Sequence, residues 1–288
     1  RPRGFLGSGS EEPNAIVQII KDKARTEPNI RATEIEIFEG FEAKSQNCWP
    51  SVNYDVGEIN NFLSPLLPAG FYYKTFMWPA KLWETYEYFI RKSAGLGVSA
   101  TERDPDLYDH KYYHCDVLIV GSGPAGLTAA SIAAESGKKV LLVDEHPEHG
   151  GSLVGSDSEH TKINDITPKD WINETFSNLS KNKNIKILNR TSVAAYHNYN
   201  YLIMVQNLTD HLNEEEKQNK IRQRLWKVRA KKVILATGSI ERTMVFDCND
   251  RPGIMLSSAV RKYLNHYGVK CGSNVVIFTN NDDAYETA

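Results

Sequence analysis

The clearest pattern of hydrophobic and polar positions lies between residues 115 and 145. Residues 116–120 and 140–143 are nearly continuous apolar runs, as expected for strands buried on both faces of a parallel sheet. The segment between them, residues 127–136, is rich in small apolar residues and predicts a helix. This order predicts a β–α–β unit, and later apolar runs predict strands over residues 185–188, 192–196, 201–205, 225–230 and 232–236.

The first hundred residues have shorter apolar segments, which predict a small domain with both strands and helices. The expected elements are a strand over 14–20, a β-hairpin that joins 33–36 to 41–44, and helices over 57–67 and 80–93. Apolar residues recur at helical spacing over 80–93; we interpret this stripe as part of a core, with a protein or domain interface as the alternative.

We therefore expect an α/β fold in three parts. They are a small α+β domain over residues 1–100, a linker over 101–114, and a domain with a parallel sheet over 115–288. The apolar run at 274–278 predicts a strand that opens a second β–α unit, truncated soon afterwards. A strand without a neighbour would expose its edge, so we interpret the sequence as a segment of a longer polypeptide.

Composition narrows the possible partners and compartments. The net charge is −2, with acidic and basic residues interspersed, so no basic face indicates nucleic acid binding. No apolar run approaches the roughly 18 residues that a membrane helix needs, and no secretory signal is present, which favours the cytoplasm. The four cysteines are far apart and form no CxxC pair, so their spacing indicates neither a redox disulfide nor a metal site.

The strongest chemical signal is a glycine-rich turn between the first strand and the helix. It consists of Gly121, Ser122, Gly123, Pro124, Ala125 and Gly126. Gly121 permits a tight turn, Gly123 lets the backbone approach a pyrophosphate, and Gly126 allows close packing of the helix on the strand. Amide groups at the helix N-terminus then face the phosphates, so the turn predicts a Rossmann-type dinucleotide site.

A carboxylate at the end of the second strand strengthens this prediction. Asp144 stands 23 residues after Gly121, where its side chain can accept hydrogen bonds from both hydroxyls of an adenosine ribose. Glu145 lies next to it and could share the ribose. A carboxylate repels a 2′-phosphate, so the pattern favours NAD or FAD over NADP.

Two more segments of small residues follow neighbouring strands. Gly150, Gly151 and Ser152 come after the second strand, and Thr237 and Gly238 come after the last one. Because the carboxyl ends of parallel strands share one edge of a sheet, we expect both segments to approach the bound dinucleotide.

No catalytic or metal-binding residue is assigned from the sequence. The candidates for acid–base chemistry are His146, His149, His160 and His266, and none has a partner that local spacing fixes. His146 and His149 lie in the cofactor loop, where either could contact the bound dinucleotide.

These motifs resemble the first nucleotide-binding domain of the glutathione-reductase-like flavoproteins over residues 115–245. Further strings resemble the alpha subunits of heterotetrameric sarcosine oxidases along essentially the whole sequence. These strings are residues 1–4, 12–15, 71–79, 241–242, 249–253 and 279–282.

This resemblance implies a function and a set of partners. It implies an alpha subunit that binds NAD without turning it over, while FAD and covalent FMN belong to a beta subunit or to the alpha–beta boundary. Smaller subunits, a small amine substrate (sarcosine, demethylated to glycine) and a tetrahydrofolate domain outside this segment are also implied. The first domain resembles a ferredoxin-like fold, but it lacks the four clustered cysteines that would hold an iron–sulfur cluster.

A second glycine-rich loop, which would hold another dinucleotide in reductases of this superfamily, is not recognisable. Its expected position is residues 278–284, which contain no glycine and two carboxylates, Asp282 and Asp283. Side chains and negative charge oppose a pyrophosphate there, so we expect a single dinucleotide.

Three hypotheses from different classes follow. The segment binds NAD within a sarcosine-oxidase-like complex, or it holds FAD in an opine, proline or amino-acid dehydrogenase, or its dinucleotide is structural in an assembly module. Fold alone does not separate them, and the long matching strings favour the first.

Overall fold

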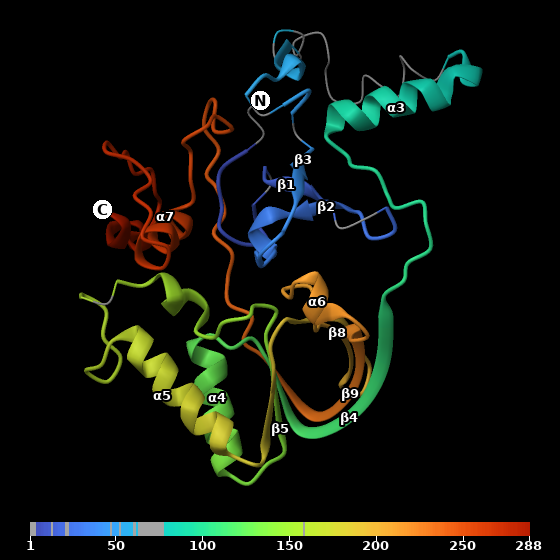
Figure 1. The fold of residues 1–288 in the computed structure, drawn as a ribbon. Coiled ribbons are helices and arrows are strands. Elements are labelled where there is room, and N and C mark those ends of the chain that lie inside the picture. The colour runs from blue at the N-terminus through green and yellow to red at the C-terminus, as the bar shows by residue number, and fades with distance from the viewer. Residues whose placement is uncertain are drawn as a thin grey trace. The chain divides into compact units, whose positions relative to one another are not determined.

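The computed structural model describes residues 4–12, 14–20, 23–46, 48–51, 53–59, 62, 78–157 and 159–288 (Figure 1). The chain divides into two compact units, one of Arg1–Pro105 with Val245–Met255 and one of Asp106–Met244 with Leu256–Ala288. Most of the helix predicted over 57–67 and of the string at 71–79 lies outside the described residues.

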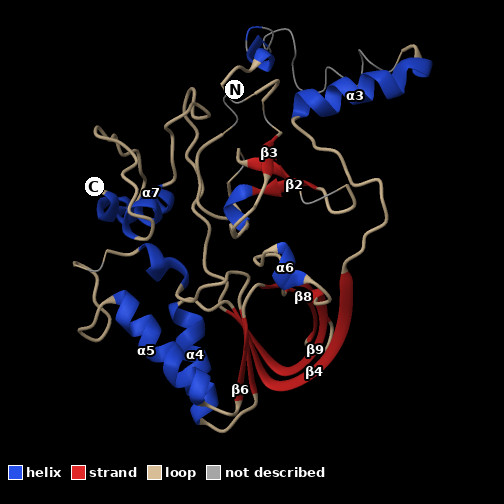
Figure 2. Ribbon diagram, viewed as in Figure 1, coloured by secondary structure: helices blue, strands red, loops and turns tan. Residues whose placement is uncertain are grey.

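The first unit contains a small antiparallel sheet (Figure 2). Its strands are β1 (Ile16–Ile19), β2 (Glu27–Arg31) and β3 (Ala43–Ser45), in the order β2-β1-β3. The strand predicted over 14–20 is confirmed. The predicted hairpin is wrong, because β3 pairs with β1 and η1 (Ala32–Glu34) is a 3-10 turn. Local alternation indicates which side chains share a face, but it does not identify the partner strand.

The helix predicted over 80–93 is present in the first unit. A 3-10 turn, η2 (Val56–Glu58), precedes it in the chain, and η4 (Ala80–Leu82) leads directly into α3 (Trp83–Ala94). The structure describes every residue of α3 and none is buried; Trp83 and Phe89 are 45% and 60% exposed. The interpretation of this stripe as core is therefore wrong for this chain, because a helix joins a core only where another element covers its apolar face. The ferredoxin-like fold of this unit stays a prediction.

A six-stranded sheet forms the centre of the second unit (Figure 2). The order is β6-β5-β4-β9-β8-β7, with β4 (Leu107–Val120), β5 (Val140–Val143), β6 (Ile185–Leu188), β7 (Thr191–His197), β8 (Tyr201–Asn207) and β9 (Ile221–Leu235). The four strands β6, β5, β4 and β9 are parallel, whereas β8 and β7 continue the sheet in antiparallel pairing. The mainly parallel sheet confirms the predicted α/β class.

The long strands β4 and β9 change two predicted boundaries. Residues 107–114, which we expected in the linker, form the first half of β4, and the two strands predicted over 225–230 and 232–236 are one strand, β9. Cross-strand contacts stabilise this polar half: the Arg224 guanidinium donates to both Asp109 carboxylate oxygens at 2.7 and 2.8 Å. An ion pair between residues far apart in the chain leaves no periodic signal in the sequence.

Helices cover one face of the parallel strands. α4 (Pro124–Glu135) and α5 (Pro168–Lys181) lie side by side there (Figure 1), and their buried residues join those of the strands in one cluster: Ile119, Leu127, Ala130, Ala134, Val140, Leu142 and Leu179. A second buried cluster, which includes Leu118, Leu141 and Trp226, fills the opposite face. Burial on both faces explains the continuous apolar runs in the sequence.

The C-terminal part of the second unit differs from the prediction. Residues 274–278, all of which are described, form no strand, and Val276 is 96% exposed. An apolar run forms a stable strand only where a neighbour accepts its backbone hydrogen bonds. The shorter elements of this unit are η5 (Gly151–Gly155), α6 (Glu214–Lys217), α7 (Ser257–Asn265) and η6 (Asp282–Thr287). Arg261 of α7 pairs with Asp283 and Glu286 of η6, at 2.9 Å each.

Candidate functional site

The glycine-rich turn leads from the end of β4 into α4, and the structure explains two of its glycines by packing. Gly121 has a φ of 101°, and a Cβ on it would lie 2.2 Å from the Ala236 carbonyl oxygen. A Cβ on Gly126 would lie 1.9 Å from the Gly121 carbonyl oxygen. Both positions therefore require glycine for the close approach of the turn to α4 and to the end of β9.

Gly123 is different, because neither packing nor backbone geometry requires glycine there. Its φ of −70° suits any residue, and a Cβ would meet only the Gly151 Cα, at 3.8 Å. As the N-cap of α4 it has no side chain to accept from the first-turn amides, and Pro124 begins the helix. An exposed helix N-terminus with an open approach fits the pyrophosphate of a dinucleotide.

Asp144 directly follows β5, and its carboxylate faces the same turn. Its Oδ2 accepts from the Ser122 amide at 2.5 Å and from the Ser122 hydroxyl at 2.7 Å. Its Oδ1 accepts from the His146 amide at 2.9 Å and lies 3.1 Å from the His146 Nδ1. The predicted ribose-binding residue is thus at the glycine-rich turn, where its carboxylate also holds the backbone of Ser122 in place.

These contacts control the ionisation of Asp144. Burial raises the pKa of the carboxyl, but the hydrogen bonds from His146 and Ser122 outweigh burial and lower this pKa to about 2. The carboxylate is therefore charged at neutral pH. A fixed negative charge at this position is the feature that opposes a 2′-phosphate.

Replacing Asp144 with Asn is expected to lower the free energy of unfolding by about 1–3 kcal/mol, because the new amide group faces donors. Since the folded pKa is lowered, the stabilisation is complete above the unfolded pKa of about 3.9. It is lost as the pH falls through the folded value of about 2. Chemical denaturation of both proteins from pH 6 to pH 2 checks this. If the difference in the free energy of unfolding between the two proteins stays constant from pH 6 to pH 2, the pKa of Asp144 is not lowered.

The Ser122 hydroxyl connects Asp144 to a histidine. The hydroxyl donates to Asp144, so the His149 Nδ1, 2.9 Å from Ser122 Oγ, must carry a proton and donate to the oxygen. The His149 ring stacks on Phe176 of α5, with 4.2 Å between centroids. Burial lowers the pKa of His149, which keeps the ring neutral in this contact. The sequence offered no signal for Phe176.

The other predicted segments lie close to the turn or at the same edge of the sheet. A Cβ on Gly151 would come within 2.9 Å of the Gly123 Cα, and one on Gly150 within 2.4 Å of the Ile172 side chain. Ser152 and Glu145 are exposed, as are Thr237 and Gly238, which follow the end of β9. The glycine pair therefore shapes the wall beside Gly123, and the binding roles of these residues stay predictions.

The structure shows that the sequence analysis was wrong to find no nearby partner for the candidate histidines. Two of them have partners at short sequence distance: His146 with Asp144 and His160 with Asp157. His266 lies 3.3 Å from a carboxylate oxygen of Glu148. An Asp side chain that accepts from the amide two residues later forms an Asx-turn, and this spacing could have indicated the His146 contact.

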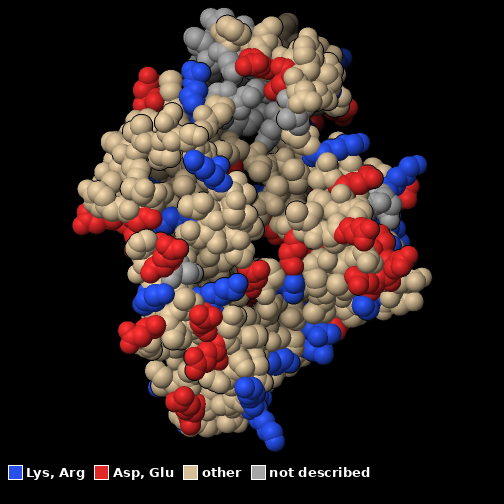
Figure 3. All heavy atoms as spheres, turned by 60° about the vertical axis from the view of Figure 1, so that its left-hand side comes forward, with Lys and Arg blue, Asp and Glu red and all other residues tan. Residues whose placement is uncertain are grey.

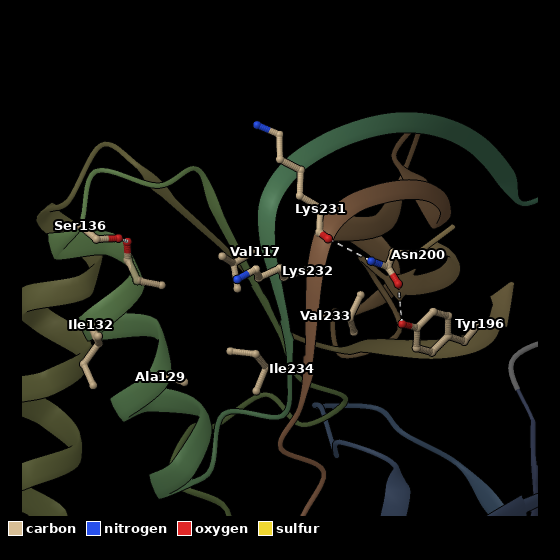
Figure 4. Close-up of a pocket in the computed structure, with 11 residues that line it drawn as sticks. Val117, Ala129, Ile132, Ser136, Tyr196, Asn200, Lys231, Lys232, Val233 and Ile234 are labelled. Atoms are coloured by element: carbon tan, nitrogen blue, oxygen red, sulfur yellow. Dashed lines mark hydrogen bonds between the residues drawn. The ribbon is translucent and has the colours of Figure 1, made fainter. Parts of the chain in front are cut away.

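A separate pocket of about 640 Å³ lies between α4 and β9 (Figure 4). Ile132 of α4 and Ser136, which follows that helix, face Val233 and Ile234 of β9 across it. At its edge, the Asn200 side-chain amide donates to the Lys231 carbonyl. None of the glycine-rich turn residues lines it. This pocket is therefore distinct from the candidate site.

Three further features of the chain are its surface charge, its metal-ligating side chains and the apolar character of its helices. On the face shown in Figure 3, basic and acidic side chains are interspersed. Among the described residues, no group of three or more His, Cys, Asp or Glu side chains could hold a metal ion. No helix in the described part of the chain has the length and apolar character needed to cross a membrane.

The chain is similar to known oxidoreductases. Residues 116–246 match a family described as FAD dependent oxidoreductase. The whole chain is 46% identical to the sarcosine oxidase subunit alpha of Rhizobium meliloti and 99% of it is 39% identical to that of a Corynebacterium species. The chain spans only 29% and 25% of the length of these two relatives.

Among solved structures, the L-proline dehydrogenase of P. horikoshii is similar to 61% of this chain and 32% of its own, with 25% identity and a TM-score of 0.45. The match to the oxidoreductase family begins within β4, at residue 116, and extends past β9, so it includes the glycine-rich turn and Asp144. The site is thus in the part of the chain that this family shares.

Proposed function

Because this chain is related over its whole length to a segment of the sarcosine oxidase alpha subunits, we propose that it is the dinucleotide-binding part of an oxidoreductase subunit of that type. The single observation that carries this proposal is the pairing of the open turn at Gly123 with the carboxylate of Asp144, whose side chain is 11% exposed. A pyrophosphate requires an open turn of this kind, and a ribose diol requires a carboxylate beside it.

The cofactor that we propose is NAD, which the resemblance to sarcosine oxidase alpha subunits implies. The charged Asp144 supports a ribose without a 2′-phosphate, which NAD and FAD share. FAD is the second candidate, because the matching family is described as FAD dependent. The absence of glycine from residues 278–284 supports a single dinucleotide in either case.

One experiment distinguishes the two cofactors. The purified chain is treated with acid, and the released compound is identified by its absorption spectrum and mass. NAD without a yellow flavin supports the first proposal. Release of FAD instead would assign the site to a flavin and would favour an opine, proline or amino-acid dehydrogenase.

Replacing Asp144 with Ala is expected to weaken dinucleotide binding by about 1–3 kcal/mol, because it removes charge-assisted hydrogen bonds to the ribose. The dissociation constant, measured by calorimetry with NAD and with FAD, checks this. Replacing the exposed Glu145 with Ala is the matched control and should change binding much less. Equal effects of the two changes would mean that the ribose lies elsewhere.

The wider function belongs to the same proposal. In a sarcosine-oxidase-like complex, this chain would hold its dinucleotide beside flavins that a beta subunit carries or shares, and the complex would oxidise sarcosine in the cytoplasm. Co-purification of the chain with a flavin-containing partner from its host tests the assembly. A chain that stays alone and still oxidises an amine would contradict it.

A further inference from the structure

The carboxylate of Asp144 already accepts as many hydrogen bonds as it has lone pairs. A carboxylate offers about four acceptor positions. Ser122 occupies two of them with its amide and hydroxyl, and His146 occupies two with its amide and ring Nδ1. A ribose diol at Asp144 must therefore displace existing donors.

Three of these four donors are held firmly. The two amides belong to backbone that further hydrogen bonds fix: Gly150 donates to the Ser122 carbonyl at 2.9 Å, and Arg190 to the His146 carbonyl at 3.2 Å. The hydroxyl of Ser122 is fully buried and is held from its other side by His149. These contacts leave little room for either residue to move.

The His146 ring is the donor that can leave. Its side chain is 53% exposed, compared with 11% for Asp144, so it can turn into solvent without opening the core. Rotation about its side-chain bonds is fast and costs little for an exposed residue. When the ring leaves, Oδ1 of Asp144 can accept from a ribose hydroxyl, whereas Oδ2 keeps both of its Ser122 donors.

We infer that the His146 ring competes with the ribose of the dinucleotide for Oδ1 of Asp144 and thereby limits the affinity of the site. This inference rests on the proposed function. It assigns His146 the opposite role from a residue that binds the cofactor, because its contact must break when the ribose binds.

Removing the ring should therefore tighten binding. Replacing His146 with Ala is expected to lower the dissociation constant of the dinucleotide about 2- to 10-fold, the scale of one net hydrogen bond. Replacing it with Gln, which keeps a donor without a charge, should give an intermediate value. The amide of residue 146 remains in both variants, so Asp144 keeps its backbone donor.

The competition should also depend on pH. The pKa of His146 is raised, mainly by its hydrogen bond to Asp144; burial and Lys262 of α7 lower it, and the charges of Asp144 and Glu145 add to the rise. A charged imidazolium binds a carboxylate more strongly than a neutral ring does. Affinity of the unchanged chain should fall as the pH decreases from about 8 to about 6, and that of the Ala variant should fall less.

The test measures NAD and FAD binding by calorimetry over this pH range with the 288-residue chain. His160→Ala is the matched control, because His160 also pairs with a nearby aspartate, Asp157, outside the site. The expected result is tighter and less pH-dependent binding for His146→Ala and no change for His160→Ala.

Three outcomes overturn the inference. Weaker or unchanged binding by His146→Ala means that the ring does not compete, while the proposed function stands. Affinity that rises at low pH only when His146 is present means that the ring contacts phosphate instead. Failure of both dinucleotides to bind any folded variant overturns the proposed function together with the inference.

Discussion

Replacing Gly126 with Ala is expected to lower the free energy of unfolding of the second unit by about 3 kcal/mol, the upper range for overpacking a tight contact. The new Cβ would lie 1.9 Å from the Gly121 carbonyl oxygen and 3.4 Å from the Ala236 side chain. Neither neighbour can withdraw easily, because Ala236 donates to the Val120 carbonyl at 2.8 Å and Gly121 to that of Val143 at 2.8 Å. The strand ends and the helix would have to separate.

Chemical denaturation followed by circular dichroism measures this loss. The control is Gly123→Ala in the same turn, where a Cβ has room and an ordinary φ, so its stability should stay close to that of the unchanged chain. Similar stability losses for the two changes would contradict the packing role of Gly126.

Replacing Gly123 with Ala should instead affect the ligand. We expect a dissociation constant about 10- to 100-fold higher for the dinucleotide, because the added methyl group occupies the approach that a pyrophosphate would use. The fold should tolerate the change, since the nearest atom is the Gly151 Cα at 3.8 Å. Binding calorimetry with NAD and FAD on a protein of unchanged melting temperature provides the measurement.

This second prediction is the stricter test of the site. A protein that binds both dinucleotides as before would show that the pyrophosphate does not approach Gly123. Reduced binding together with reduced stability would point to a packing role like that of Gly126. Only the separation of the two effects supports the assignment of one glycine to the fold and of the other to the ligand.

Gly123 and Gly126 also show that glycines of one motif can have different roles. The sequence pattern assigns a turn, a ligand approach and a packing contact to its three glycines. The structure supports a packing role for Gly126, because a Cβ there would lie 1.9 Å from the Gly121 carbonyl oxygen, whereas a Cβ on Gly123 would meet only the Gly151 Cα at 3.8 Å. Neither observation identifies the ligand. Acid release of the bound compound, followed by its spectrum and mass, is the experiment that does.

The network around Asp144 was only partly predictable. The residue itself followed from its place at the end of a buried strand, because that edge of a parallel sheet collects binding groups. The further contacts of Ser122 with His149, and of His149 with Phe176, join a loop and a helix that approach the turn only in the folded chain. Long-range contacts of this kind leave no periodicity in the sequence.

By itself, the sequence determined the β4–turn–α4–β5 arrangement, the position of Asp144 beside it, and the α/β class. These features follow from local rules, namely continuous apolar runs for buried strands and glycine where the backbone needs room. Only the tertiary structure decided that β3 pairs with β1, that polar residues 107–114 extend β4, and that residues 274–278 form no strand. Each of these depends on which distant segment supplies the backbone partner, and strand pairing is a property of two segments.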